Sequence, residues 1–138
     1  MAHEELQSLL RKMADTNASD LFLTTGAPPH LKVNGESWPL SLPILAPDHA
    51  GVLAYSVMTA GQIGDFERAL ECNFSYTAPG IGRFRISVYR QRGQTAMVAR
   101  RINASIPAFD ELGLPPVLSE LALLRRGLLL VVGSAGSG

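Results

Sequence analysis

The sequence predicts an α+β fold in which helices accompany an antiparallel sheet. Apolar residues repeat at helical spacing near the N-terminus and again between residues 47 and 70, whereas residues 74–102 form three alternating segments joined by short turns that contain glycine. Helices followed by such a meander are typical of an α+β domain. With 138 residues, 46% of them hydrophobic, the chain can bury a core and fits one domain plus a fragment of another.

The first 40 residues are expected to form a helix and three short strands. The helix covers about residues 3–16, and the strands cover 20–24, 30–33 and the segment with Trp38 and Leu40. A tight hairpin turn is expected at Asn34-Gly35, and Pro39 indicates that the third strand lies at a sheet edge. The apolar residues that repeat at helical spacing in the first segment are Leu6, Leu9, Leu10 and Met13.

Two more helices are expected before the meander begins. The first opens at Pro47 and Asp48 and ends near Gly61. Its expected apolar stripe consists of Ala50, Leu53, Ala54, Val57 and Met58. The second helix is short, and its apolar residues are Ile63, Phe66 and Leu70.

Strands are expected over residues 74–78, 83–91 and 94–102. In the second of them, alternation with a period of two separates two sets of side chains. Phe84, Ile86 and Val88 belong to a core face, and Arg83, Arg85, Ser87 and Tyr89 belong to the opposite face. The sheet is therefore expected to present guanidinium groups on the face that does not form the core.

A second domain is expected to begin after a linker. Residues 103–116 are rich in Pro, Ala, Ser, Asp and Gly, which predicts a linker between a domain over 1–102 and the start of another over 117–138. Pro115-Pro116 suits the start of a helix, and five consecutive aliphatic residues, 128–132, predict a buried parallel strand. The expected buried stripe of that helix is Val117, Leu118, Leu121 and Leu124.

The last six residues fit the first six positions of the phosphate-binding loop G-x-x-x-x-G-K-[ST]. They are Gly133, Ser134, Ala135, Gly136, Ser137 and Gly138. The loop needs a strand before it, because backbone N–H groups must converge on the phosphates, and residues 128–132 are expected to supply that strand. The alternative is a flexible linker or a cloning remnant. Without the lysine and the hydroxyl residue of the motif, the chain by itself is not expected to hydrolyse nucleotide.

Residues 83–101 contain six arginines, although the whole chain has 12 basic and 12 acidic residues. No acidic residue lies between Cys72 and Phe109, so a local positive field is expected. Arginine suits bidentate contact with phosphate. The alternative is a solvated sheet face whose arginines pair with acids from elsewhere in the fold. Nucleic acid is the weaker candidate ligand, because Phe84 and Tyr89, the aromatic residues of this stretch, alternate between faces.

Other features limit the classes of function. The single cysteine, Cys72, excludes an intramolecular disulfide and leaves no metal-binding cluster. The three histidines are isolated, and no two carboxylates form an acid-base pair, so no catalytic residue is expected within the chain. The N-terminus lacks the pattern of a signal peptide and no apolar run reaches the length of a membrane span, which predicts a cytoplasmic protein.

Four blocks of the sequence, in the same order, resemble the PilT/PilU family of type IV pilus retraction ATPases. The blocks are residues 18–35, 82–87, 100–102, and 112–118 with 126–133. Residues 71–74 and 80–85 resemble PilU more than PilT.

The resemblance implies a PAS-like N-terminal domain, a linker and the start of a RecA-like ATPase domain. It implies a hexameric ring that uses ATP and Mg²⁺ at the cytoplasmic side of the inner-membrane pilus platform, and that drives twitching motility beside a PilT-type ATPase. Arg85, Arg92 and Arg100, with Arg83, would approach nucleotide, and residues 133–138 would map onto the phosphate-binding loop. The other catalytic and metal-binding residues of the family would lie beyond the chain.

Two other classes of function stay open on the residues alone. One is a stand-alone PAS-like module that binds a small ligand or senses a signal, and the other is a domain that only oligomerises. An α+β shape excludes neither, because a fold does not determine a function.

Overall fold

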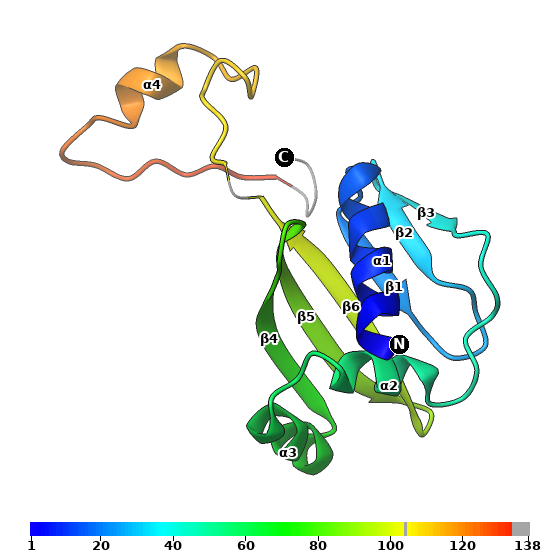
Figure 1. Cartoon of the computed structure of the whole chain (residues 1–138). Helices are drawn as coiled ribbons and strands as arrows, with labels where there is room; N and C mark the ends of the chain where they lie inside the picture. The colour runs from blue at the N-terminus through cyan, green and yellow to red at the C-terminus, as the bar shows by residue number, and fades with distance from the viewer. Residues whose placement is uncertain (104, 134–138) are drawn as a thin grey trace. The chain divides into compact units, whose positions relative to one another are not determined.

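Six antiparallel strands form the sheet around which the larger part of the chain is built (Figure 1). A computed structural model describes residues 1–103 and 105–133, and the chain divides into two compact units, Met1–Ala104 and Ser105–Gly138. The strands are β1 (Asp20–Leu23), β2 (His30–Val33), β3 (Glu36–Pro39), β4 (Glu71–Ala78), β5 (Gly82–Gln91) and β6 (Gln94–Ile102). Their order across the sheet is β3-β2-β1-β6-β5-β4. The predicted α+β class and antiparallel sheet are therefore confirmed.

The centre of the sheet joins two hairpin systems that are far apart in the sequence. Strand β1 pairs with β6 in the register Asp20↔Arg100 and Leu23↔Met97. The predicted hairpin turn between β2 and β3 is confirmed, since Asn34 and Gly35 have φ angles of 50° and 85°, as a two-residue turn of this kind requires. Pro39 lies in the edge strand β3, as expected, where its missing N–H costs the sheet no hydrogen bond on the solvent side.

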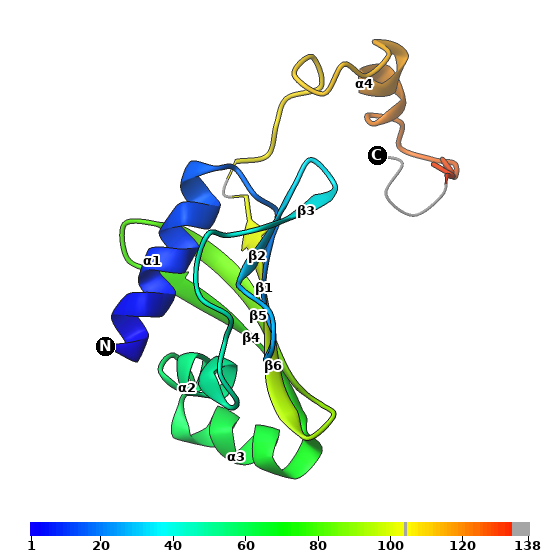
Figure 2. The ribbon, with the colours of Figure 1, turned by 90° about the vertical axis from the view of Figure 1, so that its right-hand side faces the viewer.

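Helices α1 (Ala2–Asp15) and α2 (His49–Tyr55) lie against one face of the sheet, as Figure 2 shows. The predicted stripe of α1 is buried, with Leu6, Leu10 and Met13 at 0% exposure. Phe84, Ile86 and Val88 of β5 are also fully buried, which confirms the predicted alternation along this strand. Within residues 1–103, no helix covers the opposite face of the sheet, which we refer to as the open face.

The predicted end of the second helix was wrong. Helix α2 ends at Tyr55, and Gly61 lies inside α3 (Ala60–Ala69). The reason is a capping box: the backbone N–H of Thr59 donates to Gln62 Oε1 at 2.8 Å, and the Gln62 N–H donates to Thr59 Oγ1 at 3.3 Å. These two bonds satisfy donors that the first turn of α3 would otherwise leave unpaired, so a new helix starts there.

Three apolar residues assigned to these helices lie outside them. Val57 and Met58 follow α2 and are half-buried against the core. Leu70, predicted to belong to the apolar stripe of α3, is instead its C-terminal cap, with a φ of 61° and 55% exposure. A left-handed residue at a helix end turns the chain away, so its side chain does not continue the stripe.

The smaller unit contains helix α4 (Val117–Leu121), and this helix buries none of its residues. The predicted buried stripe of Val117, Leu118, Leu121 and Leu124 was therefore wrong. The predicted strand over 128–132 was also wrong, because these residues form no strand and are 54–87% exposed. A buried parallel strand requires neighbouring strands and covering helices, and the described residues 105–133 contain no other strand.

Candidate functional site

A single row across the open face brings together four charged side chains from four strands. The register pairs Lys32 of β2 with Asp20 of β1, Asp20 with Arg100 of β6, and Arg100 with Arg85 of β5. Residues directly opposite each other in neighbouring strands lie on the same face of a sheet. Arg85 and Arg100 are both exposed, whereas their neighbours Phe84 and Ala99 are fully buried on the helix-covered face.

Asp20 and Arg100 form the ion pair at the centre of this row. Arg100 Nε donates to Asp20 Oδ1 at 2.7 Å, and the hydroxyl of Ser19 donates to Asp20 Oδ2 at 2.8 Å. The side chain of Asp20 is 5% exposed, whereas that of Arg100 is 70% exposed. In the part of the chain that the structure describes, neither terminal NH₂ group of Arg100 has a hydrogen-bond partner.

Arg85 and Arg100 border a shallow hollow of about 400 Å³, which Asn73, Ser87 and Val98 complete. Among residues 1–103 and 105–133, Arg85 has no side-chain hydrogen bond and no acidic partner within ion-pair distance. The carboxylate of Asp20 balances one of the two guanidinium charges, so the hollow keeps a net positive charge. Two guanidinium groups, an amide and a hydroxyl suit an anion with several oxygens, such as a phosphate group.

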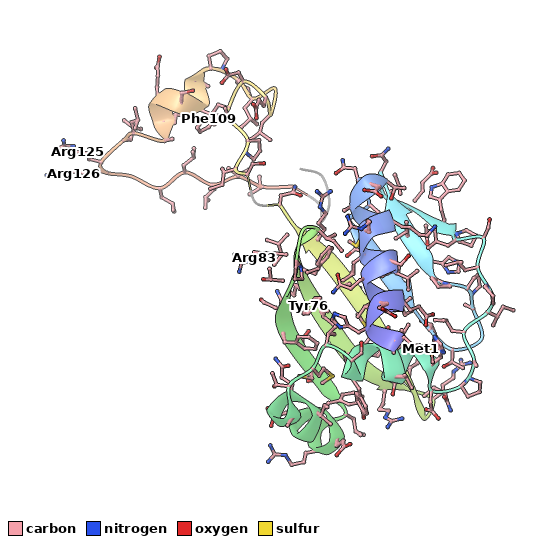
Figure 3. The ribbon with its side chains drawn as sticks, viewed as in Figure 1. Met1, Tyr76, Arg83, Phe109, Arg125 and Arg126 are labelled. Atoms are coloured by element: carbon pink, nitrogen blue, oxygen red, sulfur yellow. The ribbon has the colours of Figure 1, made fainter. Side chains whose placement is uncertain are left out.

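The other two candidate arginines lie at different distances from this hollow. Arg83 follows the same alternation two residues from Arg85, about 7 Å along β5, and Figure 3 shows it near the end of the strand that lies away from α3. Arg92 lies in the turn between β5 and β6, with a φ of 51°. Before this turn begins, β5 runs six residues from Arg85 to Gln91, or about 20 Å. The structure therefore brings Arg83, Arg85 and Arg100 together and leaves Arg92 apart.

The remaining two arginines of the cluster stabilise the fold. The guanidinium of Arg90 lies 5.7 Å from the centre of the Phe66 ring. Arg101 donates to Asn17 Oδ1 at 3.1 Å and to the carbonyl of Ala14 at 3.4 Å, so it binds the C-terminal end of α1. Within the described residues, Arg100 is therefore the one arginine of the six that forms an ion pair with an acid from elsewhere in the fold, which was the alternative to phosphate binding.

Sequence reasoning assigned no role to Asp20 and missed its link to the six arginines of residues 83–101. The signal available in the sequence was its position: a carboxylate at the start of a strand whose following residues are apolar. Its partner lies 80 residues away. That pairing follows from the β1–β6 register, which local periodicity does not reveal.

The structure describes only the first residue of the predicted phosphate-binding loop. Gly133, the first residue of the predicted phosphate-binding loop, is exposed and outside any helix or strand, and residues 134–138 lie outside the described residues. Over the described ranges, no three His, Cys, Asp or Glu side chains gather closely enough to hold a metal ion. In the same ranges, every helix is too short or too polar to cross a membrane.

A second, more apolar pocket lies beside α1. It measures about 410 Å³ and is lined by Leu9 of α1 and by the loop with Leu42, Ile44 and Leu45. At its rim, His49 Nε2 lies 2.9 Å from Glu5 Oε1. The apolar lining fits a small hydrophobic group, not a phosphate.

No family model matches the chain, but it is similar in sequence to several known proteins. It is 46% identical over 134 residues to the type IV pilus ATPase PilU of Pseudomonas aeruginosa, 37% identical over 134 residues to the PilT retraction ATPase of the same organism, and 30% identical over 131 residues to a twitching motility protein of Neisseria gonorrhoeae. These matches cover 95–97% of this chain, but the chain spans only 35–39% of the length of these relatives.

Solved structures agree with the sequence matches. A crystal structure of the pilus retraction motor PilT with bound ADP is similar with a TM-score of 0.73 and 38% identity, over 83% of this chain and 34% of that one. The ATPase DotB of Legionella pneumophila shares the fold, with a TM-score of 0.74 and 20% identity, over 92% of this chain and 37% of that one. The chain therefore belongs to the PilT/PilU family and corresponds to the N-terminal third of its members.

Proposed function

We propose that this chain is the N-terminal part of a type IV pilus retraction motor and that its open face supplies arginines to bound nucleotide. The observation that carries the proposal is the Arg85–Arg100 pair at the positively charged hollow. Its chemistry suits a phosphate group, and the relatives are named as ATPases, one of them with ADP bound. The higher identity to PilU, 46% against 37% for PilT, supports a PilU-like motor.

In the proposed motor, the PAS-like domain works within a hexameric ring in the cytoplasm, at the inner-membrane platform of the pilus and beside a PilT-type ATPase. ATP and Mg²⁺ bind the RecA-like domain, whose phosphate-binding loop begins at Gly133–Gly138. Binding of ATP closes the arginine-bearing domain over the phosphates, and hydrolysis releases it, so that the subunits move in turn. Nucleic acid has no part in this proposal.

The closure gives Arg85 a testable role. A guanidinium that meets charge developing on the phosphoryl group stabilises the transition state more than the bound nucleotide. Arg85→Ala in the full-length motor should therefore lower kcat by a factor of about 10³–10⁵ at saturating ATP and change KM for ATP far less. Arg68→Ala is the matched control, because Arg68 is an exposed arginine that pairs with Asp65 on α3. An unchanged kcat in Arg85→Ala would refute the role.

The apolar pocket beside α1 favours one second candidate, a module that binds a small hydrophobic ligand. Titration calorimetry on this chain with a set of small apolar compounds separates the two. If the chain is a sensor module, one of these compounds should bind with a saturable heat of binding. Ile44, which is 65% exposed, lines this pocket, and Ile44→Asp should abolish that heat. The motor proposal expects no such saturable ligand.

A further inference from the structure

We propose that Asp20 is a positioning residue that holds the guanidinium of Arg100 so that Arg100 and Arg85 bind one phosphate group together. The inference rests on the proposed function, because it assigns a residue to the same arginine site. It goes beyond that function by naming a side chain that would not itself touch the nucleotide.

Burial is the first argument. Asp20, at 3% exposure, is the one charged residue that is buried among the described residues. A buried carboxylate is unfavourable unless it is paired and hydrogen-bonded. Even then, an apolar residue of similar volume often makes the fold as stable as the ion pair does, or more stable. The same face of β1 holds Phe22 two positions later, so this part of the sheet accepts apolar side chains. The carboxylate of Asp20 is therefore better explained by its hydrogen bond to Arg100 than by packing.

The geometry of the hydrogen bonds is the second argument. Ser19 donates to Oδ2 at 2.8 Å and so fixes the carboxylate, whose Oδ1 then accepts from Arg100 Nε at 2.7 Å. This is the short distance of a charge-assisted hydrogen bond. Because the bond uses Nε, both terminal NH₂ groups of Arg100 stay available for a second acceptor. The side chain is 70% exposed, so an incoming ligand can reach it.

The position of Arg85 is the third argument. It lies directly opposite Arg100, where Cβ atoms of neighbouring strands are about 5 Å apart and like charges repel. Without Asp20, that repulsion would drive the flexible Arg100 side chain away from Arg85. With Asp20 holding Nε, the two guanidinium groups stay close enough to share one anion, and an anion between them removes the repulsion.

The test is a double-mutant cycle in the full-length motor, measured as kcat and KM for ATP. The variants are Asp20→Leu, Arg100→Ala and the two combined, with Asp65→Leu as the matched control at an exposed ion pair. Asp20→Leu keeps a similar volume and leaves Arg100 exposed to water, so it is expected to fold. We expect it to lower kcat by about tenfold or more, as misplaced groups do, with little change in KM, and to have no further effect in the Arg100→Ala background.

A second readout tests the position of Arg100 directly in this chain. Arginine Nε–H signals measured by NMR should show slow hydrogen exchange for Arg100, and this protection should be lost in Asp20→Leu but kept in Asp65→Leu. Titration with inorganic pyrophosphate should shift the signals of Arg85 and Arg100 together in the unmodified chain, and only that of Arg85 in Asp20→Leu.

The possible results separate the two proposals. If Arg85→Ala and Arg100→Ala lower kcat but Asp20→Leu does not, the positioning role is overturned and the proposed function stands. An equal loss from Asp20→Leu with and without Arg100 also overturns it, since Asp20 would then act by another route. If neither arginine variant lowers kcat, the proposed function fails. If Asp20→Leu does not fold, Asp20→Asn, which keeps the shape and loses the charge, takes its place in the same cycle with the same criteria.

Discussion

Replacement of Phe66 should detach helix α3 from the rest of the fold. Phe66 is the only residue of α3 that is buried, at 0% exposure. Its ring contacts the ring of Tyr55, the last residue of α2, edge to face, with centroids 6.0 Å apart and planes at 75°. The guanidinium carbon of Arg90, from β5, lies 5.7 Å from the centroid of the same ring. One side chain therefore joins α3 to a second helix and to the sheet.

The expected loss follows from these contacts. Truncation of a buried Phe to Ala costs about 3–5 kcal/mol in lost burial and cavity formation. Phe66→Leu keeps most of the apolar volume and loses the aromatic pair, worth about 0.5–1.5 kcal/mol, and the cation–π contact, worth about 0.5–1 kcal/mol at an exposed site. We therefore expect the free energy of unfolding to fall by about 4 kcal/mol in Phe66→Ala and by about 1–2.5 kcal/mol in Phe66→Leu.

Urea unfolding followed by circular dichroism measures both losses. Leu70→Ala is the control, because Leu70 ends the same helix but is 55% exposed, and its loss should stay within about 0.5 kcal/mol. A loss in Phe66→Ala no larger than in the control would refute the assignment of Phe66 as the anchor. If the effects of Phe66→Leu and Arg90→Ala are additive, the Arg90 contact contributes no attraction, whereas a coupling of about 0.5–1 kcal/mol would support it.

Two further predictions concern the stability of the same unit. A Cβ at Gly51 of α2 would lie 3.1 Å from Oγ1 and 3.3 Å from Cβ of Thr95, which is buried and restricted at χ1, so Gly51→Ala should destabilise the fold by about 1–3 kcal/mol. Gly64→Ala in α3 places no atom within 4 Å of the new Cβ and should stabilise the fold by about 0.5–1 kcal/mol. Equal effects of the two substitutions in thermal unfolding would contradict this account. Burial raises the pKa of Tyr76 above its ordinary value of 10.0, against the opposing effect of its hydrogen bond from Gln7. The folded state thus favours the neutral phenol, so its contribution to stability is complete below pH 10 and is lost as the pH rises towards the folded-state pKa. Between pH 9 and 11, Tyr76→Phe should reduce the fall in stability, measured in a Cys72→Ala background because burial also raises the pKa of Cys72 from 9.0; equal slopes with and without the phenol would disprove the linkage.

The sequence by itself determined the elements whose patterns are local. The stripe of α1, the alternation along β5 and the turn at Asn34-Gly35 follow from helical spacing, from the period of two and from residues that accept positive φ. Each of these depends on neighbours within a few residues, so the printed sequence suffices to predict it. The family resemblance, too, came from short blocks of residues, and the relatives confirm it.

Features that depend on partners far along the chain were decided by the tertiary structure. The β1–β6 register placed Asp20 beside Arg100 across 80 residues, and the folded sheet divided the six arginines between the open face of the sheet, a turn, a helix end and an aromatic ring. Residues 128–132 had the pattern of a strand but form none, because the described part of their unit has no strand to pair with them. Periodicity sets which face of an element is apolar, whereas pairing depends on the hydrogen bonds and burial that only the assembled core provides.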